Sequence, residues 1–151
     1  MNTAASLLLS WDRAIPVDDK AAWRDPWVAE AYQAAAVASD PTSPSRNPPS
    51  FRAPSGAMAD SFDLASGRKL WDAGPITAHV LVIRSQNDFW SRPEDVTTLA
   101  QDLRQAASVR TVTIPGATHY VHLDRPERGR SRFIAEVTRT LAQPADVKPF
   151  D

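Results

Sequence analysis

The sequence predicts an α/β protein in which two parallel strands are joined by a crossover helix, followed by a C-terminal helix and preceded by a helical segment. Two apolar runs, residues 80–83 and 109–114, are short enough to be strands covered on both faces. Between them, Ser91-Arg92-Pro93-Glu94 has the pattern of a capping box, which is typical of a helix start. The order strand, helix, strand, helix after Gly74-Pro75 favours a parallel sheet with helical connections.

The two helices of this second half carry apolar stripes at helical spacing. The first stripe comprises Val96, Leu99, Ala100, Leu103 and Ala107, and the second comprises Phe133, Ile134, Val137 and Leu141. Asp124-Arg125-Pro126-Glu127 repeats the cap pattern before the second helix. We expect four arginines to lie on the solvated face of this region: Arg128, Arg130, Arg132 and Arg139.

The first half of the chain is predicted to be helical and shows no strand pattern. We expect a short apolar helix over residues 2–11. A second helix is expected over residues 27–38, because Asp25-Pro26 provides an N-cap and a proline at the first helical position. Prolines concentrated in residues 39–54 predict an extended surface loop, and a further helical pattern follows over residues 58–65.

Composition and charge narrow the class of protein. At 151 residues we expect one domain. Seventeen basic and eighteen acidic residues give a net charge of −1 without a basic block, so neither nucleic-acid nor membrane-surface binding is expected. The lack of cysteine excludes disulfides, thiolate metal sites and a cysteine nucleophile. No signal peptide or transmembrane segment is indicated, so we expect a cytoplasmic protein, and one without a cofactor.

Two polar residues follow the two predicted strands at corresponding places. Asp88 comes just past the first strand, and His119 follows the second. Because reactive groups of parallel sheets gather outside the carboxyl ends of the strands, we expect these side chains to be neighbours. A carboxylate bound to one ring nitrogen of a histidine fixes the tautomer, which leaves the other nitrogen free to accept a proton from a nucleophile. The pair would be two thirds of a catalytic triad.

The residues around this pair resemble the C-terminal part of an α/β-hydrolase. The strand VLVI leads to an acid turn, RSQNDFWS, and the run IPGATHYVHLDRPE resembles the segment around the catalytic histidine. The resemblance implies that Asp88 is the triad acid and His119 the general base, acting on esters or related acyl compounds. It also implies that residues 1–73 are the helical lid, or cap, of such an enzyme and that residues 74–151 are the C-terminal part of its core.

One departure from the family pattern affects the expected activity. The sequence contains no G-x-S-x-G motif, and the family order places the nucleophile, the oxyanion-hole loop and the earlier strands before the lid. We therefore expect a partial α/β-hydrolase fold that is inactive alone. The nucleophile of the complete site would be a serine or, as in some branches of the family, an aspartate.

A non-enzymatic interpretation is the alternative. Without the rest of the sheet, the strand at residues 80–83 would have an unpaired edge and uncovered apolar faces. Such a strand favours self-association, or pairing with the other half of a split hydrolase. Two parallel strands also bury little apolar area, so we expect marginal stability.

Three residues near the pair have more than one interpretation. Phe89 and Trp90, next to Asp88, either pack in the interior or line an acyl pocket for the substrate. His119 and His122 form an H-x-x-H pair, but neither a helix nor a third ligand accompanies them. We therefore expect no metal site and a structural role for His122.

Overall fold

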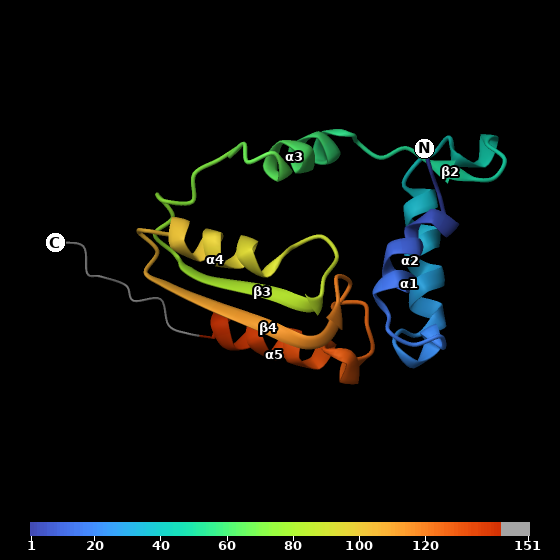
Figure 1. Cartoon of the computed structure of the whole chain (residues 1–151). Helices are drawn as coiled ribbons and strands as arrows, with labels where there is room; N and C mark the ends of the chain where they lie inside the picture. The colour runs from blue at the N-terminus through green and yellow to red at the C-terminus, as the bar shows by residue number, and fades with distance from the viewer. Residues whose placement is uncertain (143–151) are drawn as a thin grey trace.

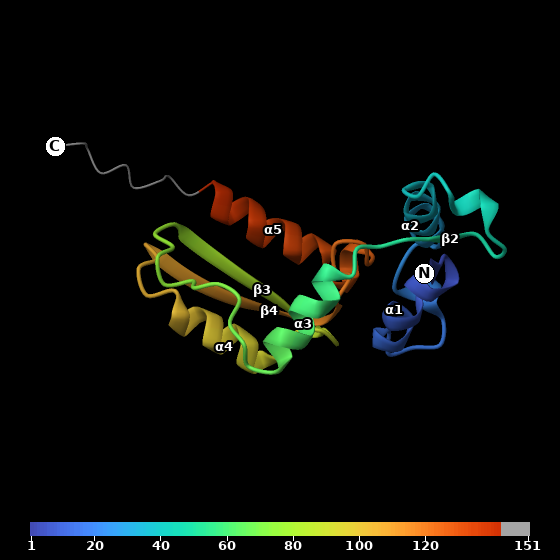
Figure 2. The ribbon, with the colours of Figure 1, turned by 90° about the horizontal axis from the view of Figure 1, so that it is seen from above.

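The second half of the chain forms a two-stranded parallel sheet with one helix on each face. In the computed structural model, which describes residues 1–142, strand β3 (His79–Asn87) pairs with strand β4 (Ser108–Thr118). Helix α4 (Pro93–Asp102) connects the strands, and helix α5 (Arg130–Leu141) follows them. The two helices lie on opposite faces of the sheet (Figures 1 and 2). These elements confirm the predicted mixed α/β class, with its parallel strands, crossover helix and C-terminal helix.

The strands extend beyond the apolar runs that predict them, and this extension shapes the end that carries Asp88 and His119. Regular pairing stops at Ser85 opposite Ile114 and resumes, after a shift of register, at Asn87 opposite Thr118. Gly116 makes the intervening bend with φ of +69°, a conformation that glycine adopts without strain. Its N–H donates to Oε1 of Gln86 at 2.8 Å, and its carbonyl accepts from Nδ2 of Asn87 at 3.0 Å. These bonds hold the two strand ends together.

The N-terminal segment contains short strands as well as helices. Its elements are β1 (Asn2–Thr3), the 3-10 turn η1 (Ala5–Leu7), α1 (Leu9–Ala14), η2 (Lys20–Ala22), α2 (Pro26–Ala38), η3 (Ser43–Ser45), β2 (Ser50–Phe51) and α3 (Gly56–Ala65). The prediction of α2 is confirmed, as is that of a helix in the region of α3. The prediction of one helix over residues 2–11 is wrong, as is the lack of strands, because β1 and β2 pair antiparallel with each other.

Asp40 explains how the proline-rich loop over residues 39–54 adopts a fixed shape. Its buried carboxylate accepts hydrogen bonds from the backbone N–H and the guanidinium of Arg52, both at about 3 Å. It also accepts from the backbone and hydroxyl of Thr42 and from the guanidinium of Arg46. Residues from both ends of the loop therefore bind the carboxylate of Asp40. The loop closes on itself in this way, and β2 lies beside β1.

Two cap predictions are wrong. The capping box at α4 is formed by Arg92 and Asp95, one residue later than expected, because the hydroxyl of Ser91 donates to Asp88 instead. Asp124 does not cap a helix either. The chain makes the 3-10 turn η4 (Pro126–Arg128), and Gly129, with φ of +118°, precedes α5.

Parts of the predicted apolar and solvated faces also differ from the structure. Ile134 is 54% exposed and Leu141 is 79% exposed, so two of the four residues predicted to form the buried stripe of α5 face solvent. Arg128 lies over the ring of Trp23, 4.7 Å from its centroid, so it is not part of a solvated face. The indole ring of Trp23, in the N-terminal segment, attracts the guanidinium of Arg128 through a cation–π interaction.

Within residues 1–142, buried apolar residues form two clusters. One contains Ile114, Ala117 and Val121 between the sheet and α5. The other contains Trp11, Ile15, Trp23 and Val28 in the N-terminal segment, where Tyr120 and Leu123 from the second half pack against it. The loop that carries His119 therefore contacts both clusters. Within residues 1–142, no helix is both long and apolar enough to cross a membrane.

Candidate active site

The carboxylate of Asp88 is fixed by the turn that leads from β3 to α4. Oδ1 accepts hydrogen bonds from the backbone N–H of Trp90 at 2.7 Å and of Ser91 at 3.2 Å. Oδ2 accepts from the hydroxyl of Ser91 at 2.9 Å. This is the local side-chain-to-backbone bonding that aspartate makes in turns. Both carboxylate oxygens therefore have donors from the turn itself.

His119 follows the last residue of β4 and meets this carboxylate. Its Nδ1 lies 3.0 Å from Oδ1 of Asp88, as a consequence of the parallel pairing that places both strand ends at the same edge. With Asp88 ionised, Nδ1 carries the proton of this hydrogen bond and Nε2 is the basic nitrogen. Among residues 1–142, no hydrogen-bond partner occupies Nε2, and the side chain is 38% exposed. Nε2 can therefore accept a proton from a substrate, a water molecule or a nucleophile that approaches from solvent.

The protonation of Asp88 fits the role of an orienting acid. Burial raises the pKa of Asp88, but the hydrogen bonds from Trp90 and Ser91 and the charge of His119 outweigh it. The pKa of the carboxyl is therefore lowered from its ordinary value. Asp88 is ionised near neutral pH, which is the state that accepts from Nδ1–H and stabilises an imidazolium.

Aromatic rings surround the histidine on the side of the acid turn. The ring of Phe89 lies 5.0 Å from that of His119, and Tyr120 meets the imidazole edge-on at 5.2 Å. Phe89 and Trp90 meet at 6.3 Å and are about half exposed, so neither packs in the interior. Their role in an acyl pocket stays a prediction.

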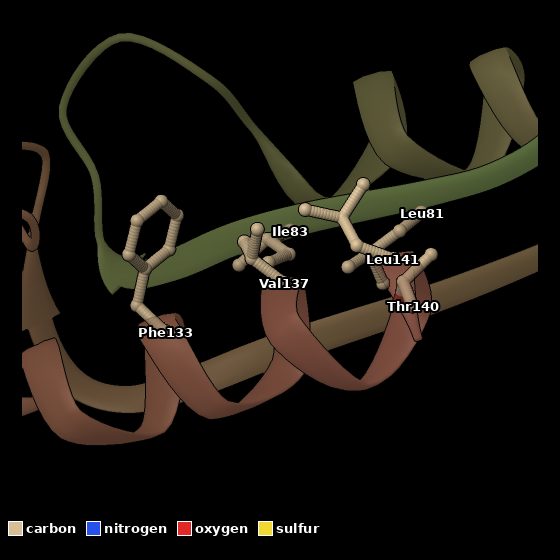
Figure 3. Close-up of a pocket in the computed structure, with 6 residues that line it drawn as sticks. All are labelled: Leu81, Ile83, Phe133, Val137, Thr140 and Leu141. Atoms are coloured by element: carbon tan, nitrogen blue, oxygen red, sulfur yellow. The ribbon is translucent and has the colours of Figure 1, made fainter. Parts of the chain in front are cut away.

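The described hollows lie elsewhere on the molecule. A groove of about 330 Å³ runs between β3 and α5, lined by Leu81, Ile83, Phe133, Val137, Thr140 and Leu141 (Figure 3). A second hollow, of about 430 Å³, lies beside Asp40 and Arg52. Neither is lined by Asp88 or His119. A substrate bound at His119 would therefore not lie in either of these two hollows.

The second histidine of the H-x-x-H pair does not join the site. His122 is exposed, and no hydrogen bond joins it to another residue of the described part of the chain. Within residues 1–142, no three histidine, aspartate or glutamate side chains lie close enough together to hold a metal ion.

The sequence pattern does not predict the contacts made by Ser91, Trp11 and Asp124 near the pair. Ser91 is expected to cap a helix, and it binds Asp88. Asp124 is also expected to be a cap, but it is fully buried and binds Trp11 and Thr118. The Asp-x-x-Ser spacing of residues 88–91 is a local signal for the first contact. The contact of Trp11 with Asp124 spans 113 positions and leaves no local signal.

Comparisons with protein-family models, curated proteins and solved structures find no match to this chain. The functional interpretation therefore depends on the geometry of the acid and the histidine.

Proposed function

We propose that this chain supplies the acid and the histidine of a hydrolytic site of the α/β-hydrolase type, acting on esters or related acyl compounds. The observation that carries the proposal is the 3.0 Å contact of Nδ1 of His119 with the ionised Asp88 at the carboxyl ends of two parallel strands. In this arrangement Nε2 accepts a proton from the attacking group, and Asp88 stabilises the imidazolium that results. The N-terminal segment would be the lid, and Phe89 and Trp90 would border the acyl group.

The nucleophile of this site is not among the groups that contact His119. No serine of residues 1–142 donates a hydrogen bond to its ring, and the sequence has no G-x-S-x-G motif. In the complete reaction, a serine from outside the described residues would attack the carbonyl carbon and pass its proton to His119, whereas the aspartate of other branches would attack the carbon of an epoxide or haloalkane. By itself the chain would act only as a base that activates water.

Hydrolysis of an activated aryl ester tests the proposal on the chain as it is. The chain alone is expected to be inactive by the serine-hydrolase mechanism, so the pair by itself should give only a weak acceleration of p-nitrophenyl acetate hydrolysis through base-activated water, without an acyl-enzyme burst. His119→Ala should abolish the acceleration, and Asp88→Asn should lower it by about tenfold or more. His79→Ala is the matched control, because His79 is exposed and its ring is bound to the hydroxyl of Ser108 at the opposite end of the two strands.

Two outcomes would contradict the proposal. An acceleration that is equal in the wild type and in His119→Ala would show that the pair has no catalytic role. Covalent labelling by a serine-reactive phosphonate, lost on substitution of one serine, would show that the chain holds a nucleophile after all.

The groove beside β3 favours a second candidate function, as an interaction module. Among the described residues β3 pairs only with β4, so its other edge is unpaired, and the apolar groove lies between β3 and α5 (Figure 3). An added strand along this edge would pair with the free backbone groups of β3 and cover the groove.

A further inference from the structure

The loop of His119 is tied to the N-terminal segment by a buried hydrogen-bonded bridge. The indole N–H of Trp11, in α1, donates to Oδ1 of Asp124 at 2.8 Å. Oδ2 of Asp124 accepts from the backbone N–H of Thr118 at 3.2 Å and from its hydroxyl at 2.8 Å. Trp11, Asp124 and Thr118 are all fully buried. A carboxylate in such a place is retained only with a full set of donors.

The bridge ends next to the base. Thr118 is the last residue of β4 and directly precedes His119. Its hydroxyl also accepts from the backbone N–H of Tyr120 at 3.1 Å, so Asp124 holds the backbone on both sides of His119 through one threonine. The ring of Trp11 stacks on that of Tyr120 at 4.8 Å. The side chain of Trp11 therefore contacts the segment 118–120 in two ways, through Asp124 and through the ring of Tyr120.

Further contacts show that this is one interface. The backbone N–H of Arg125 donates to the carbonyl of Trp23 at 2.8 Å, and the guanidinium of Arg125 donates to the carbonyl of Ala21 at 2.7 Å. An ion pair of 2.7 Å joins Arg125 to Asp25. These bonds dock the N-terminal segment on the residues that follow His119. Trp11 reaches the histidine loop through the buried carboxylate of Asp124.

We infer that docking of α1 sets the geometry of the Asp88–His119 pair, with Trp11 and Asp124 as positioning residues that act through Thr118. The inference depends on the proposed function of the pair and adds a means of regulating it. When α1 is docked, the bridge holds His119 with Nδ1 facing Asp88. When α1 is undocked, Asp124 loses its indole donor, the backbone around Thr118 is released, and Nδ1 separates from the carboxylate.

The tautomer of His119 reports this coupling without any measurement of activity. In the ¹⁵N-labelled full chain, long-range proton–nitrogen spectra should show the wild-type imidazole protonated at Nδ1. Trp11→Phe keeps an aromatic ring for stacking but removes the donor, and Thr118→Val keeps the volume but removes the hydroxyl. Both variants should lose the Nδ1–H signal in favour of Nε2–H.

Two matched variants should keep the wild-type spectrum. Thr118→Ser restores the hydroxyl, and Trp27→Phe alters a tryptophan of α2 that is 67% exposed. Slow hydrogen exchange of the Trp11 indole N–H, compared with that of Trp27, would confirm that the bridge is closed in solution. Circular dichroism establishes that each variant is folded, and if Trp11→Phe is unfolded, the comparison of Thr118→Val with Thr118→Ser decides.

The outcomes separate this inference from the proposed function. Retention of the Nδ1–H tautomer in either folded test variant overturns the inference alone. A wild-type His119 that is not protonated at Nδ1 overturns both. An intact wild-type tautomer that responds to the bridge, with an acceleration of ester hydrolysis that is equal in the wild type and in His119→Ala, leaves the coupling standing and overturns the role of His119 as the base.

Discussion

Oδ1 of Asp88 lies 3.0 Å from Nδ1 of His119, and the same carboxylate accepts three hydrogen bonds from the turn that follows it. The turn therefore fixes the acid whether or not the histidine is present. The histidine, in contrast, depends on contacts from a distant part of the chain. We therefore expect substitutions near Asp88 to have local effects, and substitutions in the N-terminal segment to affect the position of His119.

Ser91→Ala tests the side of the acid. Removal of the hydroxyl takes one donor from Oδ2 of Asp88, so the pKa of that carboxyl should rise toward its ordinary value. The free energy of unfolding should fall by about 1 kcal/mol. Carboxyl ¹³C titration and urea denaturation measure the two effects. Ser61→Ala, which removes only a bond to a helix carbonyl on the surface, should leave the pKa of Asp88 unchanged.

Asp124→Ala tests the bridge as a source of stability. The substitution leaves the indole N–H of Trp11 and both donors of Thr118 buried without an acceptor. Because each unsatisfied buried donor costs about 1 to 3 kcal/mol, the free energy of unfolding should fall by about 3 kcal/mol or more. Denaturation by urea measures the loss. A decrease below about 1 kcal/mol would show that water satisfies these donors, and that the bridge is weak.

Gly129→Ala should destabilise the connection between β4 and α5. A Cβ at this position would lie 2.9 Å from Cβ of Ala117, and φ of +118° is a conformation that alanine avoids. Gly67→Ala is the matched control, because φ is +82° there but no atom lies within 4 Å of the added carbon. We expect a cost of about 1 to 2 kcal/mol at Gly67 and a larger one at Gly129. Equal losses in thermal melts would show that Ala117 moves aside freely.

The pH dependence of stability should show a decline in acid. Hydrogen bonds from Arg52 and Thr42 hold the pKa of Asp40 well below its usual range, and the pKa of Asp88 is lowered as well. The unfolded chain therefore binds more protons as the pH falls through about 4, and the free energy of unfolding decreases. Asp40→Asn should reduce this decline, which urea denaturation at a series of pH values would measure. An unchanged acid dependence in the variant would contradict the assignment to Asp40.

Asp124 contributes to this pH dependence with the opposite sign. Burial raises the pKa of Asp124 more than the hydrogen bonds from Thr118 and Trp11 lower it. Its contribution to stability is therefore present in acid and is lost as the pH rises through its folded-state pKa. Asp124→Asn should make the decline in acid steeper than in the wild type. A shallower decline would mean that the donors, not burial, dominate the pKa of Asp124.

Leu81→Lys tests the interaction surface. Leu81 lies on β3 and lines the groove with Ile83, so a charge there should oppose the addition of a strand from another chain. We expect self-association, measured by sedimentation velocity over a range of concentrations, to decrease in the variant. Leu64→Lys, on exposed α3, is the control. Equal association of wild type and Leu81→Lys would exclude the β3 edge as the contact.

The sequence by itself determines the local elements and the neighbourhood of the two polar residues. The apolar runs specify β3 and β4, Asp25-Pro26 specifies the start of α2, and parallel pairing places Asp88 and His119 at the same edge. These features depend on periodicity, on the fixed φ of proline and on the geometry of a parallel sheet, all of which are local or follow from one pairing. They are readable without a tertiary structure.

Only the tertiary structure decides which of these residues bind one another. Ser91 and Asp124 both have the sequence pattern of helix caps. In the structure, however, Ser91 donates to the carboxylate of Asp88, and Asp124 accepts from the indole of Trp11. A buried carboxylate requires donors from every side, and for Asp124 these come from Trp11 and Thr118 at different distances along the chain. The same requirement gathers Arg46 and Arg52 around Asp40. Satisfaction of buried charge is a property of the assembled fold, which is why local pattern does not predict it.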